Sequence, residues 1–280
     1  MKTLKATLSL LNLKGGVGKT VSIVGLATSL VRLTGGRVLL IDADPQGGLT
    51  RWTTAGDPKR FKRGNLSSVI FGHHDLTEAI IALDDPDLHP DDPSRADLWK
   101  GVSLLPCATV RVVVDATFGG SIDYGALRKI VQEQTPDDIS FVLVDVGHGD
   151  NDSTRLGVVA SDVTATVVAA WQYQSVYQLG AANKMIKDIR DAPGLSHVHL
   201  GGAIVTGFDE SKATHRNIVD GLRSKLRDNV WGIVPWRADI ERAINRNRPL
   251  TAMPSRINPV PQVYENIGRT ALSKIMKGQD

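Results

Sequence analysis

The chain has 280 residues, of which 41% are hydrophobic and 22% charged, and its formal net charge at pH 7 is +3. This length and hydrophobic content are enough for one sizeable core, so we expect a single domain over residues 1–280. The only cysteine, Cys107, excludes an internal disulfide, and no apolar segment is long enough to span a bilayer or to act as a signal peptide, which predicts a cytoplasmic protein.

A glycine-rich loop follows the first predicted strand. Residues 7–13 form an apolar run short enough for a buried strand, and residues 21–33 carry apolar side chains at helical spacing. Between them stands Lys14-Gly15-Gly16-Val17-Gly18-Lys19-Thr20. In such a loop the backbone N–H groups surround phosphate oxygens and the positive end of the helix dipole faces them. The sequence therefore predicts ATP as ligand, with Lys19 at the β- and γ-phosphates and the Thr20 hydroxyl on Mg²⁺. The expected contacts to ATP from this segment are Gly15, Gly16, Val17, Gly18, Lys19, Thr20 and Val21.

Two aspartates follow predicted strands where a nucleotide site would lie. The second strand, residues 38–41, leads into Asp42-Ala43-Asp44-Pro45-Gln46-Gly47-Gly48, and a later strand, residues 141–144, leads into Asp145. Because ligands bind outside the carboxyl ends of strands in open α/β sheets, we expect both strand ends beside the glycine-rich loop. Thr20, Asp44 and Asp145 are the predicted Mg²⁺ residues.

The rest of the chain continues to alternate between strands and helices. Apolar runs predict strands at 102–105, 165–170, 199–206 and 230–234, and helical periodicity predicts helices at 124–134, 176–189, 217–226 and 239–245. This pattern indicates an α/β fold with a single doubly wound, mostly parallel sheet flanked by helices. Residues 84–100, rich in Asp and Pro at their start, are expected to form an exposed insertion, and a C-terminal helix at 261–277 is expected to dock on the domain through its apolar side.

The glycine-rich loop resembles the deviant Walker A motif of the ParA/MinD group of dimeric P-loop ATPases. The usual motif would have glycine where this chain has Leu13, and Lys14 matches the additional lysine of the deviant form. The resemblance implies that Lys14 reaches the nucleotide of a partner subunit, that Asp44 positions the attacking water, and that Asp145 is the Walker B aspartate. Lys14, Lys19 and Asp44 are therefore the predicted catalytic residues. ParA proteins usually continue with Thr-Pro-Pro after that aspartate, whereas this chain has Val146-Gly147-His148, and we interpret His148 as a loop histidine.

The C-terminal third resembles the ParA segment that follows the adenine pocket. Pro235, Trp236 and Arg237 are the predicted base-contacting residues, although Trp236 stands where arginine is common. Trp231 and Trp236 are expected to be packing residues rather than stacking platforms. Composition alone does not separate a DNA-binding face from solvated arginines, and the resemblance favours DNA. The predicted DNA contacts are Arg216, Arg223, Arg242, Arg246 and Arg248, with Arg242 and Arg246 four residues apart on one helix face.

The function implied by this resemblance is that of a ParA-like ATPase. Such a protein forms a nucleotide sandwich homodimer on ATP, binds nucleoid DNA without sequence preference, and segregates a plasmid or chromosome with a ParB-like or centromere-binding partner that stimulates slow hydrolysis. Because the loop begins at residue 14, we expect the short form without an N-terminal helix-turn-helix domain. The C-terminal helix has few basic residues, which argues against a MinD-like membrane anchor. Two alternatives stay open: an ATPase that positions protein or conjugation cargo, and a small-molecule kinase or ligase of the dethiobiotin synthetase type.

Overall fold

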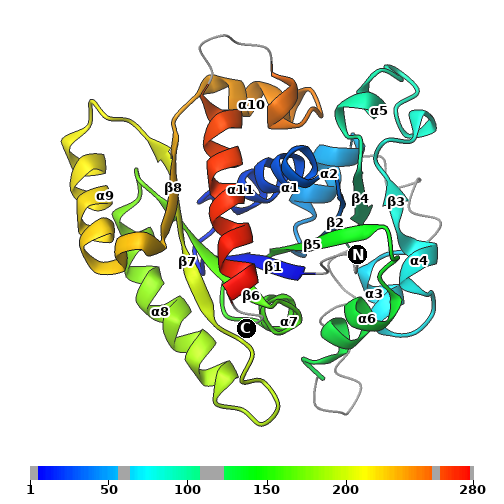
Figure 1. Cartoon of the computed structure of the whole chain (residues 1–280), viewed down its shortest axis with the longest axis horizontal. Coiled ribbons are helices and arrows are strands. Elements are labelled where there is room, and N and C mark those ends of the chain that lie inside the picture. Colours follow the sequence, from blue (N-terminus) through cyan, green and yellow to red (C-terminus); the bar gives the residue numbers. More distant parts are fainter. Residues whose placement is uncertain (1–5, 56–63, 108–122, 254–258, 278–280) are drawn as a thin grey trace.

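In the part of the chain that the structure describes, eight strands form one sheet in the order β3-β4-β2-β5-β1-β6-β7-β8 (Figure 1). The structure is a computed structural model that describes residues 6–55, 64–107, 123–253 and 259–277. The β3–β4 pair is antiparallel, and all other neighbouring pairs are parallel. The strands are β1 (Ala6–Leu11), β2 (Arg37–Ala43), β3 (Ile81–Ala82), β4 (Val102–Leu105), β5 (Ile139–Val146), β6 (Val163–Ala169), β7 (Leu200–Phe208) and β8 (Val230–Pro235). The predicted doubly wound, mostly parallel sheet is confirmed.

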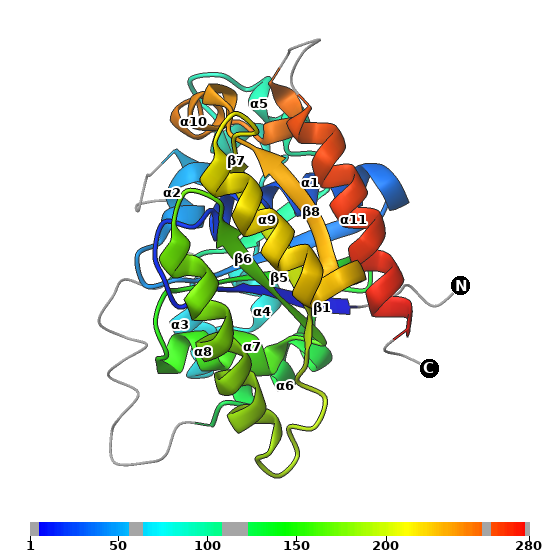
Figure 2. The same ribbon diagram turned by 90° about the vertical axis from the view of Figure 1, so that its left-hand side faces the viewer.

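Helices cover both faces of this sheet (Figure 2). They are α1 (Lys19–Thr34), α2 (Gly48–Thr54), α3 (Leu66–Ile70), α4 (Leu76–Ala79), α5 (Arg95–Leu98), α6 (Ala126–Gln134), α7 (Asp152–Ala160), α8 (Tyr173–Arg190), α9 (Ala213–Leu226), α10 (Ala238–Asn245) and α11 (Val260–Lys277). Short 3₁₀ turns lie at η2 (Pro86–Leu88), η3 (Arg227–Asn229) and η4 (Leu250–Ala252). Helices α1, α6, α8, α9, α10 and α11 lie within a few residues of their predicted positions, whereas α2, α3, α4, α5, α7 and the short strand β3 were not predicted. The missed helices α2 to α5 are too short to show a helical apolar period.

The central strands are buried on both faces because successive side chains alternate between two hydrophobic layers. In β2, Val38 and Leu40 join the layer under α1 and α11, whereas Leu39 and Ile41 join the layer under α3, α4, α6, α7 and part of α8. A strand has a side-chain period of two, so a continuous apolar run serves both faces at once. A smaller third cluster connects the ends of β6 and β7 with α9.

The C-terminal helix α11 packs against α1, the helix that follows the glycine-rich loop. Tyr264 of α11 is fully buried, and its hydroxyl lies 3.0 Å from the Ser22 hydroxyl oxygen in α1. A Cβ added to Gly25 would lie 2.5 Å from the Tyr264 ring, so glycine is required at this contact. The Tyr264 ring of α11 therefore packs directly against the backbone of α1 at Gly25.

Residues 84–100 are not simply an exposed insertion, and this expectation is corrected. Leu88, His89 and Trp99 are buried, and the segment contains η2 and α5. The Trp99 indole donates to the Asn247 carbonyl at 3.2 Å. Aspartates and prolines occupy the exposed positions of this segment, while three large side chains attach it to the core.

Candidate nucleotide-binding site

The order of the strands reverses at β1, and the glycine-rich loop lies at the carboxyl ends of the strands at this point. From β1 the chain crosses to β2 on one side, and it later continues through β6, β7 and β8 on the other. A crevice at such a switch point, outside the carboxyl ends of the strands, is where open α/β sheets bind ligands. The loop of residues 12–18 leaves β1 at this crevice and leads directly into α1.

Asn12 fixes the start of this loop, and this role was not predicted. Its side-chain amide donates to the Val167 carbonyl of β6 at 2.7 Å, and its Oδ1 accepts the Lys14 amide at 2.8 Å. This Asn turn ends β1 at Leu11, two residues before the predicted boundary. Gly16 and Gly18 have φ values of 73° and 91°, which a side chain would strain. The glycines therefore permit the loop to curl as a phosphate-binding loop requires.

The far side of the loop is held by β7. Thr206 Oγ1 donates to the Val17 carbonyl at 2.6 Å, and a Cβ on Gly18 would lie 3.3 Å from the Thr206 methyl carbon. Val17 itself is buried, and Val21 is partly buried against the α1 layer. These contacts hold the loop backbone against β7, and the ATP contacts expected from Val17 and Val21 stay predictions.

Lys19, Thr20 and Asp145 meet at the base of the loop as predicted. Lys19 is 7% exposed and its Nζ donates to the Asn12 carbonyl at 3.3 Å. The Thr20 hydroxyl donates to Asp145 Oδ2 at 2.7 Å. Burial lowers the pKa of the Lys19 ammonium, and the charges of Asp145 and Asp44 oppose this effect. The arrangement gives one buried cation beside two carboxylates.

One carboxylate oxygen of Asp145 is available to a hydrated divalent cation. Its side chain is fully buried, and Oδ1 has no hydrogen-bond partner among the described residues. A buried carboxylate oxygen without a partner is costly, and burial raises the Asp145 pKa well above its usual range, with the Asp42 charge adding to the effect. Together with the Thr20 hydroxyl, these oxygens fit Mg²⁺, which binds one or two protein oxygens, waters and substrate phosphates.

Asp42 belongs to the same cluster, although the sequence analysis did not include it among the site residues. It pairs in register with Asp145 across β2 and β5 and is fully buried. Its carboxylate accepts the Thr50 amide at 2.8 Å and the Asp44 amide at 3.2 Å. Burial raises its pKa to about 6. The sequence did contain a signal for Asp42. It directly follows the apolar run 38–41, just as Asp145 follows the run 141–144, and the ends of these two parallel strands lie side by side.

Asp44 stands in a turn that is held on several sides. Its Oδ1 accepts the Gln46 amide at 2.8 Å, and its carbonyl accepts the Gly47 amide and the Cys107 thiol, the latter at 2.9 Å. The Ser153 hydroxyl donates to the carbonyl of the preceding residue, Ala43. Cys107 is thus a half-buried structural contact of this turn, and burial raises the pKa of its thiol.

Lys14 and His148 lie at the open rim of the loop. The Lys14 ammonium donates to Gln174 Oε1 in the first turn of α8 at 2.7 Å, and this contact is solvent-exposed. The exposed His148 ring lies beside Gly15, because a Cβ there would be 3.7 Å from the ring, and the next residue, Gly149, donates its amide to the Leu13 carbonyl. The loop after Asp145 is therefore attached to the phosphate-binding loop.

The predicted base-contacting residues lie on the same sheet edge, at the end of β8. Pro235 pairs with Phe208, and the Trp236 amide donates to the Phe208 carbonyl at 2.8 Å. Trp231 is buried as expected, but the expectation of a packed Trp236 is wrong: its side chain is 61% exposed and touches Trp171 edge-to-face at 5.3 Å. Arg237 is exposed at the N-terminus of α10. The predicted base-contacting residues therefore lie at the end of β8 and in the turn that follows it, and not in the core.

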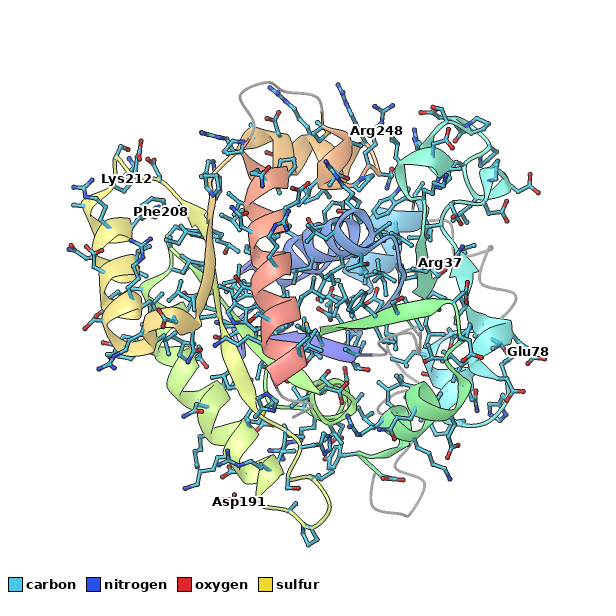
Figure 3. All side chains as sticks on the ribbon, in the orientation of Figure 1. Arg37, Glu78, Asp191, Phe208, Lys212 and Arg248 are labelled. Carbon is cyan, nitrogen blue, oxygen red and sulfur yellow. The ribbon has the colours of Figure 1, made fainter. Side chains whose placement is uncertain are left out.

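The five predicted DNA contacts do not share one environment. Arg216 and Arg223 are exposed on α9, while Arg242 pairs with Asp239 at 3.0 Å, and Arg246 is the exposed residue that ends α10. Figure 3 labels Arg248 at the upper end of the molecule. Its side chain is only 33% exposed, and its guanidinium lies 3.4 Å from the carboxylate of Asp92 in the 84–100 segment. Arg242 is also paired, but its side chain is 63% exposed, so the lower exposure of Arg248 makes Arg248 the weakest of the five candidates.

The fold and this site define a P-loop NTPase of the doubly wound α/β type. The family model described as "CobQ/CobB/MinD/ParA nucleotide binding domain" matches residues 8–250, and the chain belongs to this family. It is 26% identical over 272 residues to the Chromosome-partitioning ATPase Soj of Thermus thermophilus, covering 96% of each chain. The predicted resemblance to ParA-type proteins is confirmed.

Solved structures show the same fold. A plasmid partition protein from Borrelia burgdorferi B31 bound to AMPPNP superposes with a TM-score of 0.75 at 20% identity, covering 96% of this chain and 99% of that one. The cobyrinic acid a,c-diamide synthase of Mycobacterium smegmatis with bound ADP and magnesium gives a TM-score of 0.75 at 19% identity, covering 99% and 97%. The predicted ligands, ATP and Mg²⁺, agree with what these structures contain. In the described part of the chain, no helix is long and apolar enough to cross a membrane.

Proposed function

We propose that this protein is an ATP hydrolase of the ParA type, which dimerises around ATP and binds DNA without sequence preference in that state. The observation that carries the proposal is the cluster of Lys19, Thr20 and Asp145 under a glycine loop, with Lys14 at its solvent-exposed rim. A lysine that faces solvent at the mouth of a phosphate site is placed to meet a second subunit. The relative named as a chromosome-partitioning ATPase supports the same class.

In this proposal, each residue acts by position and charge. The loop amides and Lys19 hold the β- and γ-phosphates, and Thr20 and Asp145 hold Mg²⁺, which supplies charge neutralisation when bound. Asp44, in its restrained turn, orients the attacking water, and Lys14 leaves Gln174 to neutralise charge on the partner's nucleotide. Pro235, Trp236 and Arg237 border the base. Hydrolysis then opens the dimer.

DNA binding would use the exposed basic side chains of the C-terminal third. Phosphate contacts made by Arg216, Arg223, Arg242 and Arg246 give a sequence-independent and salt-sensitive attraction. A chain bound to the nucleoid in its ATP state and released by a ParB-like partner would move a plasmid or chromosome within the cytoplasm. Arg248 is retained in this set with a smaller expected effect, because it pairs with Asp92 and its side chain is much less exposed than that of Arg242.

The decisive experiment measures binding to random-sequence duplex DNA without nucleotide, with ADP and with ATP–Mg²⁺, each at two salt concentrations. The proposal predicts binding only with ATP–Mg²⁺ and weaker binding at the higher salt concentration. Absence of binding in all three states would refute the DNA step, and turnover of a small carboxylate substrate would then favour the small-molecule enzyme class.

Two substitutions separate the steps of the cycle. Asp44→Ala is expected to bind ATP and DNA but to hydrolyse ATP at least about tenfold more slowly, and normal hydrolysis by this variant would remove Asp44 from the mechanism. Lys14→Ala is expected to keep ATP binding in the monomer and to lose ATP-dependent dimerisation in sedimentation experiments. Unchanged dimerisation and turnover would refute the role of Lys14 in the partner's site.

A further inference from the structure

Helices α8 and α9 leave an apolar groove between them on the outer side of β6 and β7. The two helices lie side by side in both views (Figures 1 and 2). The groove between their side chains has a volume of about 570 Å³. Its walls include Val176 and Leu179 of α8 and Ile218, Leu222 and Leu226 of α9. Three of these, Val176, Leu179 and Leu226, are only partly buried against the small third core cluster. The two helices thus contact the sheet without closing over each other.

The rim of this groove carries two of the most exposed aromatic side chains that the structure describes. Tyr173 is 64% and Tyr177 is 68% exposed, and their rings meet edge-to-face at 5.3 Å. Tyrosines four residues apart stand on one helix face, here the face that lines the groove. Rigid, amphipathic rings beside an open apolar surface are typical of protein-binding sites.

The two helices also concentrate positive charge. Together they carry six basic and two acidic residues, a net charge of +4, which exceeds the +3 of the whole chain. Lys184 and Lys187 continue the tyrosine face of α8 by helical spacing, and Lys225 lines the groove. These three lysines form no ion pair with any residue that the structure describes. Figure 3 shows α8 and α9 from Asp191 at the lower end to Lys212 at the upper end.

We propose that the α8–α9 groove docks an acidic amphipathic helix of a partner protein. Its apolar side chains at helical spacing would fill the groove between Leu179 and Leu222, and its carboxylates would pair with Lys184, Lys187 and Lys225. Helix-in-groove recognition uses this combination of an apolar floor and a charged rim. The docking goes beyond the proposed ATPase site and does not require nucleotide.

Duplex DNA is the less suitable occupant of this groove. Arg216 and Arg223 are seven residues apart and share one stripe of α9, about 100° or more around the helix from Ile218 and Leu222. Phosphates would meet those arginines on the outer face of α9, whereas the groove floor offers apolar side chains that a phosphate backbone does not use. Helix α9 therefore has a basic face with Arg216 and Arg223 and a separate apolar face with Ile218 and Leu222.

The position of the groove links it to the nucleotide site. Gln174, which holds the Lys14 ammonium, stands between Tyr173 and Tyr177 in the sequence of α8. A helix seated against the two tyrosines would lie beside this contact. An influence of docking on Lys14 rests on the proposed function, whereas the docking itself does not.

The test uses two fluorescein-labelled 18-residue peptides with leucine at helical i, i+3, i+4 and i+7 positions. One has glutamate and the other lysine at the remaining positions, and both are titrated with the full chain in fluorescence anisotropy without nucleotide. The glutamate peptide is expected to bind at least about tenfold more tightly than the lysine peptide. The double variant Tyr173→Ser/Tyr177→Ser and the variant Lys225→Glu are each expected to weaken its binding by at least about tenfold.

Matched controls are found on α11, where Met276 is 62% exposed and Arg269 is exposed. Met276→Ser and Arg269→Glu should bind the glutamate peptide like the wild type, and all variants should bind ATP normally, which separates this test from the proposed ATPase function. Equal binding of both peptides, or unchanged binding by the groove variants, would overturn the proposal. So would a tyrosine variant that loses DNA binding or self-association but still binds the peptide, because the groove would then serve DNA or a second copy.

Discussion

Substitution of Gly25 by alanine tests whether the contact between α1 and α11 governs the stability of the domain. The new methyl group would lie 2.5, 2.6 and 2.7 Å from three carbons of the Tyr264 ring. Carbon atoms in contact are normally 3.5–4.0 Å apart, so the ring or the helix must move by about 1 Å. Tyr264 is fully buried and hydrogen-bonded to Ser22, so its ring cannot turn into solvent.

Two effects of opposite sign then compete. Overpacking of a buried site typically costs about 1–3 kcal/mol, and loss of the Tyr264–Ser22 hydrogen bond would add about 1 kcal/mol. Alanine in a helix interior is favoured over glycine by about 1 kcal/mol. Since the steric cost is larger, Gly25→Ala should lower the free energy of unfolding by about 1–3 kcal/mol.

The matched control is Gly221→Ala in α9, where an added Cβ meets no atom within 4 Å. This variant should gain up to about 1 kcal/mol from helix propensity alone. Urea unfolding followed by circular dichroism, without nucleotide, measures both variants against the wild type. A Gly25→Ala variant as stable as Gly221→Ala would refute the reasoning. Tyr264→Leu combined with Gly25→Ala should cost less than the sum of the two single changes, because the ring that blocks the methyl group is gone.

Three further predictions concern the site and the 84–100 segment. Because burial raises the folded-state pKa of Asp42 to about 6, its stabilising contribution is complete below the unfolded pKa near 4 and is lost as the pH rises through about 6. In EDTA and without nucleotide, Asp42 and Asp145, whose pKa is similarly raised, should make the free energy of unfolding fall from pH 4 to pH 7, and Asp42→Asn should reduce this decline without abolishing it; a rise with pH would contradict the assignment. Thr20→Val keeps the shape of the side chain but removes the hydroxyl that contacts Asp145. In calorimetry it should weaken Mg²⁺-dependent ATP binding at least about tenfold and leave Mg²⁺-free binding unchanged. Equal losses in both conditions would argue against a metal role for Thr20. Arg248→Ala should reduce the urea midpoint by an amount equivalent to about 0.5–1 kcal/mol through loss of the Asp92 pair, and DNA binding by this variant should fall less than in Arg242→Ala; the reverse order would restore Arg248 as a principal DNA contact.

The parts of the site that sequence analysis identified are local. The loop from Lys14 to Thr20 needs glycines at fixed positions between a strand and a helix, and these requirements are met within a few residues. Asp44 and Asp145 follow apolar runs, and the parallel topology places the ends of such runs together. Pattern and spacing were therefore sufficient to bring these residues to one edge of the sheet.

The parts that were missed depend on contacts between distant segments. Asn12 reaches β6 across 155 positions, Thr206 reaches Val17 across 189, and Gln174 reaches Lys14 across 160. Trp236 was expected in the core because large apolar side chains usually pack, but it follows the last residue of β8 and projects from a turn. No local pattern reports which distant residue will lie opposite a given side chain.

The sequence by itself determined the class of this protein: a doubly wound sheet with a phosphate-binding loop, because strand and helix periods and glycine positions are properties of short segments. Only the tertiary structure decided that Asp42 joins the buried carboxylates, that Lys14 rests on Gln174, and that α8 and α9 leave a groove between them. These features arise when strands from different parts of the chain pair in one register, so their geometry belongs to the assembled sheet and not to any one segment.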